Sequence, residues 1–447
     1  MRDALPWLSV LGTVLVGCSG SGGSAGSSPL AIASPLVAPS PSPIATTPAP
    51  TSASTIRHVV VIVQENRSFD NLFNGYPGAD TVSVAPGSNG TSIPLHVMHL
   101  EDGVDVDHTH IGFETEYDSG RSDGFANVNL STSPPYPNYA FSYVDPTETA
   151  PYRAMASQYA LADRMFQSNS GPSYAAHQYL IAGQSADVAE VPSSAPWGCD
   201  APATATTELV NAAGIEVAGP FPCFDYPTLA DRLDAANTTW AYYTPGIDGN
   251  IGGKIWTAYD AIKHIRYSST DWGNVRSPET TIFTDLSAGH LPAMSWVIPT
   301  IANSDHPQSN SATGPQWVAS LVDAIGQSPD WNSTAIFVVW DDWGGWYDHV
   351  VPQQLDAMGL GYRVPLIAIG PYAKHGYVSH TQHEFGSILH FTEEAFGLPS
   401  LGQADARADD LADMFDFSQK PSAYHTLTSS AVRRSMSIAK PSAFMDY

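Results

Sequence analysis

The chain has 447 residues, of which 43% are hydrophobic and 11% aromatic, and this composition excludes a wholly disordered protein. Its 44 acidic and 18 basic residues give a formal net charge of −26. Because such a charge repels phosphate backbones, composition excludes binding to nucleic acids by charge. The length would allow two or three domains, and we expect one catalytic domain with insertions.

Residues 1–18 are expected to be a secretory signal peptide. They combine a single arginine, an apolar run too short to cross a bilayer and a small-residue site that ends at Cys18. Residues 15–18 resemble a bacterial lipobox, in which the cysteine is lipidated and anchors the protein. The alternative is an ordinary cleaved signal with an incidental cysteine. We therefore expect an exported protein, either an envelope lipoprotein or periplasmic or extracellular, that meets a membrane only through this anchor.

Residues 19–55 are rich in Ser, Gly, Ala, Pro and Thr and are expected to form a flexible linker. The catalytic domain is expected at 56–416, followed by a tail at 417–447 that packs on the domain or trails from it. Residues 184–227 look like a surface insertion and contain Cys199 and Cys223. In an exported chain this even pair favours a disulfide, although two separate buried thiols are the alternative.

Four short runs at 58–64, 294–299, 334–340 and 364–369 are nearly continuous in large apolar residues. This pattern predicts strands buried on both faces of a parallel sheet. Helical segments are expected at 152–166, 174–182, 317–325 and 383–396. Together these segments predict an α/β layered fold.

Polar residues directly follow three of the predicted strands, at the sheet edge where open α/β folds place their ligands. Asp341 and Asp342 are adjacent carboxylates that repel each other unless a cation or a shared proton compensates. Glu65 and Asn66 add oxygen ligands, which suits a divalent cation, and His306 or His349 would widen the choice toward zinc, iron or manganese. The alternative is that the acidic pair merely caps the next helix or turn.

Ser173 directly precedes a predicted helix, within the tripeptide Gly-Pro-Ser. A helix N-terminus favours a bound phosphate and a developing serine alkoxide, so Ser173 is a candidate nucleophile. The same tripeptide is equally compatible with a simple helix N-cap.

Six ordered strings resemble the bacterial phosphoesterase family that includes acid phosphatases and non-haemolytic phospholipases C. They are HVVVIVQENRSFDNLF, DHTH with SDGF, SNSGPSYAAHQYLIAG, LPAMSWVIP with SDHP, VVWDDWGGWYDHV and GYRVPLIAIGPYAKHGYVSHTQHEFGSILHFTEEAFGL, which span residues 58 to about 398. The family looks like a branch of the alkaline-phosphatase superfamily. This resemblance implies a three-layer α/β sandwich with a central, mostly parallel sheet and a hydroxyl nucleophile beside a bound metal.

The resemblance also implies roles for individual residues. Ser173 would be the nucleophile, and the ligands of one divalent metal ion, rather than two, would be Glu65, Asn66, Asp341 and Asp342. His108 and His306 would be catalytic residues near the transferred phosphoryl group. The residues expected to bind substrate or support the site are Asp123, His177, His349 and Glu384.

We therefore expect an exported, metal-dependent phosphoesterase that works through a phosphoserine intermediate. Many phospholipase members carry threonine and an Asp-Glu pair where this chain has Ser173 and Asp341-Asp342. This departure favours an acid phosphatase acting on small monoesters. The alternative is a phospholipase C-type diesterase on phospholipids, in which the aromatic residues 343, 346 and 347 would form an entrance or merely pack under the loop. From a different class, the chain could be a non-catalytic surface-binding lipoprotein.

Overall fold

The computed structural model describes residues 55–88, 90–246 and 255–427. The expected signal peptide with Cys18, the linker up to residue 54 and the tail from residue 428 therefore lie outside the described residues.

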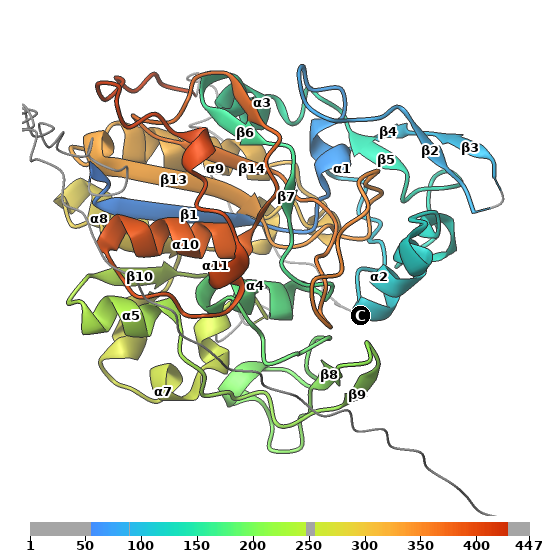
Figure 1. Cartoon of the computed structure of the whole chain (residues 1–447), viewed down its shortest axis with the longest axis horizontal. Coiled ribbons are helices and arrows are strands. Elements are labelled where there is room, and N and C mark those ends of the chain that lie inside the picture. Colours follow the sequence, from blue (N-terminus) through green and yellow to red (C-terminus); the bar gives the residue numbers. More distant parts are fainter. Residues whose placement is uncertain (1–54, 89, 247–254, 428–447) are drawn as a thin grey trace, which may run out of the picture. The chain divides into compact units, whose positions relative to one another are not determined.

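Within the described residues, eight strands form one central sheet, in the order β11-β10-β12-β1-β13-β14-β6-β15 (Figure 1). Their bounds are Val275–Arg276, Trp240–Tyr243, Met294–Val297, His58–Gln64, Thr334–Trp340, Leu366–Ile369, Ala160–Ala162 and Tyr377–Ser379. All neighbouring pairs are parallel except those that β14 makes with β13 and β6. The α/β class with a mostly parallel sheet is thus confirmed.

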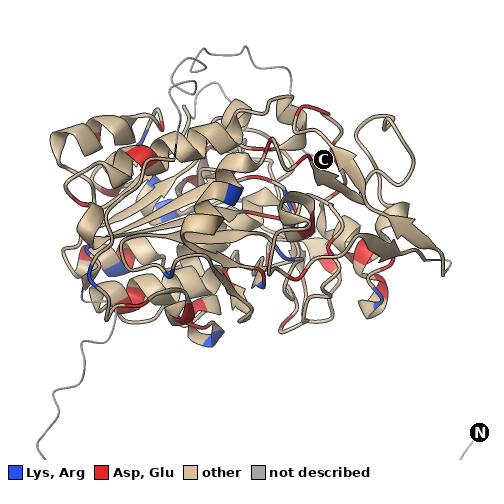
Figure 2. Ribbon diagram, turned by 90° about the horizontal axis from the view of Figure 1, so that it is seen from above, with Lys and Arg blue, Asp and Glu red and all other residues tan. Residues whose placement is uncertain are grey.

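Helices cover both faces of this sheet (Figure 2). The helices of one group pack against each other and are α3 (Ala150–Gln158), α8 (Thr281–Ala288) and α9 (Gly314–Gly326). The other consists of α4 (Ser173–Ala182), α5 (Leu229–Ala235), α10 (Phe385–Phe396) and α11 (Ala404–Arg407). A short α7 (Lys263–Arg266) lies near α5 in Figure 1. Two covered faces explain why the central strands are apolar along their whole length.

Three of the predicted elements differ from the structure. The helix expected at 152–166 ends at Gln158, because the chain then enters β6 and the short β7 (Met165–Phe166). The strand expected at 364–369 is present as β14 but runs antiparallel, since a continuous apolar run carries no information on strand direction. The helix expected from residue 383 begins at Phe385, because β16 (His383–Glu384) pairs with β7.

Smaller elements surround the sheet. A lobe on the right of Figure 1 contains α1 (Phe69–Phe73), α2 (His110–Tyr117), β2 (Val84–Pro86), β3 (Ser92–Pro94), β4 (His96–Met98) and β5 (Ser142–Val144). The segment 184–227 contains a hairpin of β8 (Glu208–Val210) and β9 (Glu216–Ala218) and a disulfide between Cys199 and Cys223. Among the residues that the structure describes, no helix is both long and apolar enough to cross a membrane.

The described part of the C-terminal tail packs on the domain. The carbonyl oxygen of Ser422 accepts a hydrogen bond from Trp331 Nε1 at 2.8 Å, and Tyr424 donates to Asp323 Oδ1 at 2.5 Å. Residues 422 and 424 therefore contact α9 and the turn that precedes β13.

Candidate active site

The carboxyl ends of β1 and β13 bring together two of the three predicted polar clusters. The strands are parallel neighbours with Gln64 opposite Trp340, so the residues that follow each strand lie side by side. The backbone N–H of Asn66 donates to Asp341 Oδ1 at 3.0 Å. Glu65, Asn66, Asp341 and Asp342 are all fully buried. The strand edge therefore places four candidate oxygen ligands in one buried site.

The Asn66 side chain has a defined orientation at this edge. Its amide nitrogen donates to Asp342 Oδ1 at 3.0 Å and Oδ2 at 3.2 Å, and it lies 2.9 Å from His108 Nε2. The amide oxygen must therefore point away from Asp342, and among the described residues it has no hydrogen-bond partner. Asn66 also has a positive φ of 59°, a conformation that asparagine tolerates better than most residues.

Ser173 lies directly beside this carboxylate edge. It begins α4 after Pro172, and its Oγ donates to Asp342 Oδ2 at 3.1 Å. Burial and then the charge of Asp341 raise the pKa of Asp342 well above its ordinary value, while hydrogen bonds from Gly344 and Ser173 oppose this rise. The candidate nucleophile thus has a carboxyl group within hydrogen-bond reach.

His177 lies one helical turn after Ser173, on the same side of α4. Its Nε2 is 3.0 Å from Glu65 Oε1 and 3.6 Å from Asp341 Oδ2. Burial lowers the pKa of His177 to about 4, although the charge of Asp341 opposes this shift. The ring is therefore neutral at pH 7 and donates a hydrogen bond from Nε2 to Glu65, which orients that carboxylate.

The donor set fits a divalent cation. Asn66 Oδ1 and Asp341 Oδ2 are buried oxygens without a hydrogen-bond donor among the described residues. Carboxylate oxygens of Glu65 and Asp341 lie within 4.8 Å of each other. Buried oxygens that lack donors are costly, and a hard cation would satisfy them.

The two predicted catalytic histidines lie next to each other, with ring centroids 6.1 Å apart. His306 Nδ1 accepts a hydrogen bond from the backbone N–H of Gln308 at 3.2 Å, so in the neutral ring the proton is on Nε2. His108 Nδ1 donates to the Val106 carbonyl oxygen at 2.7 Å, so its Nε2 accepts from Asn66. His306 can therefore act as a proton donor, whereas His108 supports a proposed metal ligand.

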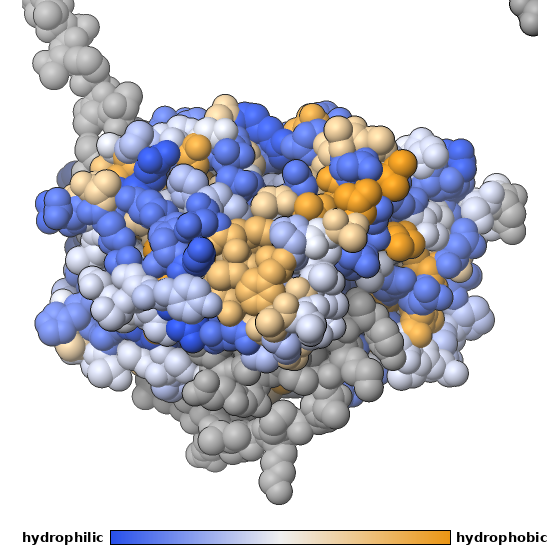
Figure 3. Space-filling model, turned by 90° about the horizontal axis from the view of Figure 1, so that it is seen from below, coloured by the Kyte–Doolittle hydropathy of each residue, from blue (hydrophilic) through white to orange (hydrophobic). Residues whose placement is uncertain are grey.

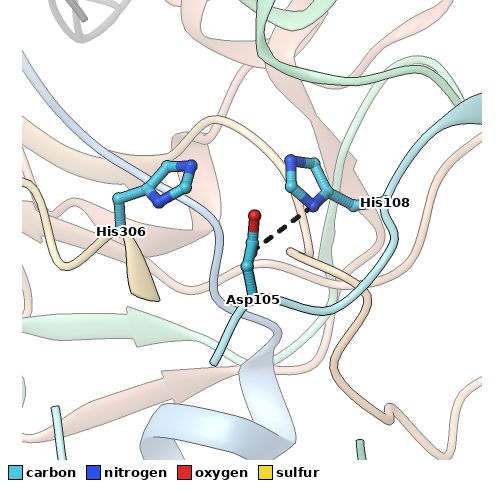
Figure 4. A group of neighbouring side chains, drawn as sticks. All are labelled: Asp105, His108 and His306. Carbon is cyan, nitrogen blue, oxygen red and sulfur yellow. Dashed lines mark ion pairs between the residues drawn. The ribbon is translucent and has the colours of Figure 1, made fainter. Parts of the chain in front are cut away.

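Asp105, which the sequence interpretation did not single out, lies beside both histidines (Figure 4). It is 5% exposed, and its Oδ1 is 3.9 Å from His108 Nδ1. An acidic residue three positions before a candidate catalytic histidine was the only available signal, and such spacing is common in loops.

Three of the predicted supporting residues have other partners. His349 lies between Asp70 Oδ2 at 2.6 Å and Asp80 Oδ1 at 3.1 Å. Burial opposes the charged form of His349, but the hydrogen bond and charge of Asp70 outweigh it and raise its pKa. The remaining two are Glu384, which caps α10 and pairs with Arg407 at 2.8 Å, and Asp123, which lies 3.8 Å from Arg121. Each of the three residues thus has an ion-pair partner outside the proposed ligand set.

The aromatic residues after Asp342 do not form an entrance. Trp343 and Trp346 are fully buried and Tyr347 is 3% exposed. Trp343 Nε1 donates to Glu116 Oε2 at 2.6 Å, and Arg67 stacks over the Trp346 ring at 5.2 Å from its centroid. Of the two possibilities expected from the sequence, an entrance or packing under the strand-end loop, the structure has the packing.

Comparison with known proteins identifies the family. Residues 56–399, most of the chain, match the model of the Phosphoesterase family. The chain belongs to the Phosphoesterase family. The family expected from the six motifs is thereby confirmed.

Relatives of this chain include proteins named as phospholipases. Hemolytic phospholipase C of Pseudomonas aeruginosa is 25% identical over 430 residues, which cover 81% of this chain and 56% of that protein. Phospholipase C A of Mycobacterium tuberculosis is 24% identical over 84% of this chain and 80% of its own length. The chain thus spans little more than half the length of the Pseudomonas relative.

Solved structures show a weak likeness. The crystal structure of Ps i-CgsB has a TM-score of 0.41 and 9% identity over 82% of this chain and 77% of that chain. A protein of the alkaline phosphatase superfamily from Vibrio parahaemolyticus has a TM-score of 0.38 and 10% identity over 78% of this chain and 70% of its own. At such TM-scores the likeness says nothing about the site.

Proposed function

We propose that this phosphoesterase hydrolyses phosphate esters through a covalent intermediate on Ser173. One divalent cation would be held by Glu65, Asn66, Asp341 and Asp342. The observation that carries the proposal is the 3.1 Å hydrogen bond from Ser173 Oγ to Asp342 Oδ2, made at the edge where the four oxygen ligands meet. The covalent phosphoserine, the cation and its ligands are parts of this proposal.

The chemistry would be an in-line displacement at phosphorus. The Ser173 Oγ–P bond forms as the bond from phosphorus to the leaving oxygen breaks, and Asp342 takes up the hydroxyl proton. His306 Nε2–H lies near the site and would protonate the leaving alkoxide. A bound cation would neutralise charge on the phosphoryl oxygens. Water then hydrolyses the phosphoserine and frees Ser173.

The barrier explains why these parts are needed together. Uncatalysed hydrolysis of a phosphate monoester is so slow that an enzyme must lower the barrier by on the order of 20 kcal/mol or more. Positioning of the nucleophile and stabilisation of charge are the two largest sources available to a protein. The buried, preorganised edge of β1 and β13 offers both.

Small phosphate monoesters are our first candidate for the substrate. The proposal rests on the serine at position 173 together with the adjacent pair Asp341 and Asp342, a combination similar to that of the acid phosphatase branch.

A phospholipase C-type diesterase is the second candidate, and the names of the relatives favour it. A pocket of about 290 Å³ is lined in part by Thr109, the residue after His108. Its lining includes the apolar Ile111 and Val191 and the acidic Glu190, Glu208 and Glu216. Figure 3 also shows apolar areas among the hydrophilic side chains of one face, which would suit contact with lipid.

The test compares p-nitrophenyl phosphate with phosphatidylcholine, using purified protein with divalent cations added back one at a time. We expect Ser173→Ala to lower kcat/KM by on the order of 10³ or more, because the covalent route is lost. Cation binding should be retained, since no proposed ligand is changed. Acid-quenched wild-type enzyme should carry a phosphoryl group on the peptide that contains Ser173, as measured by mass spectrometry.

Ser170→Ala is the matched control for this substitution. Ser170 is buried in the same segment, but its hydroxyl donates to the Met358 carbonyl oxygen and lies 3.0 Å from His110 Nδ1, and neither contact involves Asp342. We expect this variant to stay within about tenfold of wild type, because the two hydrogen bonds that it loses do not reach Asp342. Near wild-type turnover by Ser173→Ala would contradict the assignment of the nucleophile.

We further infer that the chain is exported and lipidated at Cys18. The disulfide between Cys199 and Cys223 supports an oxidising compartment. Mass spectrometry of the mature N-terminus tests the anchor, and an unmodified Cys18 in the mature chain would contradict it.

A further inference from the structure

Asp105 is a buried carboxylate whose two oxygens have different surroundings. Oδ2 accepts a hydrogen bond from Gln308 Nε2 at 3.0 Å. The backbone N–H of Asp105 donates to Ser131 Oγ, and its carbonyl oxygen accepts from the backbone N–H of Ser131. Oδ1 has no hydrogen-bond donor among the described residues, although Asp105 is only 5% exposed. A buried charged oxygen without a donor costs free energy. The presence of one in Asp105 therefore points to a role of this carboxylate in the site.

The carboxylate of Asp105 points into the gap between His108 and His306 (Figure 4). Ligand atoms of the three residues lie within 4.8 Å of one another, an arrangement that resembles a second metal site. The hydrogen bonds contradict that interpretation. The lone pair of neutral His108 accepts from Asn66, and that of neutral His306 accepts from Gln308, so neither ring has a lone pair left for a metal ion.

A continuous series of contacts instead joins Asp105 to the nucleophile. Asp105 Oδ1 is 3.9 Å from His108 Nδ1, and His108 Nε2 is 2.9 Å from the amide nitrogen of Asn66. That nitrogen donates to both oxygens of Asp342, and Asp342 Oδ2 accepts from Ser173. The Val106 carbonyl oxygen accepts a hydrogen bond from Nδ1 of His108, and the nearby negative charge of Asp105 adds to the preference for a proton on this nitrogen. Nε2 is then the acceptor that Asn66 requires.

We propose that Asp105 is a positioning residue that acts through His108. Together with the Val106 carbonyl oxygen, it keeps the proton of His108 on Nδ1 and so holds the Asn66 amide with its nitrogen toward Asp342 and its oxygen toward the cation site. This inference rests on the proposed function, because it assigns the amide oxygen to a bound cation. The pattern is the familiar one in which a carboxylate orients a histidine next to a metal ligand, with the histidine here orienting an asparagine.

The test measures binding of Mn²⁺ and Zn²⁺ by calorimetry, together with kcat/KM and the melting temperature of the metal-free protein. We expect Asp105→Ala to weaken cation binding and to lower kcat/KM by roughly 10- to 100-fold each, the usual effect of losing an outer partner of a metal ligand. Asp105→Asn, which keeps the shape but not the charge, should show a smaller loss of both. The metal-free melting temperature should fall slightly in Asp105→Ala, which loses the hydrogen bond from Gln308 Nε2 to Oδ2, and should stay unchanged in Asp105→Asn, whose amide oxygen can still accept it.

Asp107→Asn is the matched control on the same segment. Asp107 Oδ1 accepts from the backbone N–H of Thr109 at 3.1 Å and from its hydroxyl at 2.7 Å, contacts that do not involve His108. We expect wild-type cation affinity in this variant. If Asp105→Ala does not fold, Asp105→Asn provides the measurement, because it is isosteric with the native residue.

The possible outcomes separate this inference from the proposed function. Wild-type cation affinity and turnover in both Asp105 variants would overturn the inference while leaving the function intact. A lower melting temperature without a change in cation affinity would reduce Asp105 to a structural residue. Binding of two ions by wild type and one by Asp105→Ala would replace the inference with a second metal site. A wild-type protein that binds no cation and hydrolyses no ester would remove the proposed function itself.

Discussion

At the scale of single residues, Asp342 links the two halves of the candidate site. Its carboxylate accepts hydrogen bonds from Ser173 Oγ, from the Asn66 amide and from the backbone N–H of Gly344. The same carboxyl group has a raised pKa, because burial and the neighbouring charge of Asp341 disfavour its ionised form. A cation would relieve both causes, so protonation of Asp342 and cation binding are expected to oppose each other.

This opposition predicts a pH dependence of cation binding. Below the raised pKa of Asp342 the metal-free site holds an extra proton, and a carboxylate ligand must lose that proton when the cation binds. Affinity should therefore rise with pH by up to about tenfold per unit, until the pH exceeds that pKa. Calorimetry in buffers of different ionisation enthalpy measures the proton release. In Asp342→Asn the release should disappear, and an unchanged release would exclude Asp342 as its source.

At the scale of elements, the turn after β13 controls how closely two strand ends approach. Gly344 has a φ of +64°, and a Cβ on it would lie 2.2 Å from the backbone oxygen of Asn66. A side chain would therefore have to push Asn66 away from Asp342. The close packing of the two strand ends depends on glycine at this position for both space and backbone conformation.

Gly344→Ala is accordingly expected to lower the free energy of unfolding by about 3 kcal/mol or more, since strain and overpacking act together. Cation affinity and turnover should also fall, because Asn66 is displaced. Gly397→Ala is the control: Gly397 ends α10 with a φ of +65° and has nothing within 4 Å of its added Cβ. It should lose only about 1–2 kcal/mol, the cost of the left-handed conformation. Urea denaturation measures both values, and equal losses would contradict the predicted clash.

At the scale of the whole molecule, the dominant property is the formal net charge of −26. Asp and Glu are spread over many helices and loops rather than gathered in one patch (Figure 2). The proposed substrates carry anionic phosphate, so the long-range field of the protein opposes their approach. A bound cation would offset this repulsion only locally.

Added salt should therefore assist an anionic substrate. Raising the ionic strength from about 0.01 M to about 0.15 M shortens the Debye length from about 30 Å to about 8 Å and screens the long-range repulsion. We expect kcat/KM for p-nitrophenyl phosphate to rise several-fold, mainly through a lower KM. Zwitterionic short-chain phosphatidylcholine serves as the control substrate and should respond weakly. A kcat/KM for p-nitrophenyl phosphate that falls with salt would contradict a repulsive field.

The sequence alone determined the α/β fold class and the family of this protein. Buried apolar runs with polar residues at their ends identified the strands at 58–64 and 334–340, and ordered motifs identified the family, because both signals are local in the chain. Only the tertiary structure decided the direction of β14, the end of α3 at Gln158 and the partners of His349 and Glu384. Sheet pairing and buried charge pairs join residues far apart in sequence, and local patterns do not encode them. The structure likewise decided that Asp105 and His108 lie beside His306, because the loop before α2 and the loop after β12 meet there.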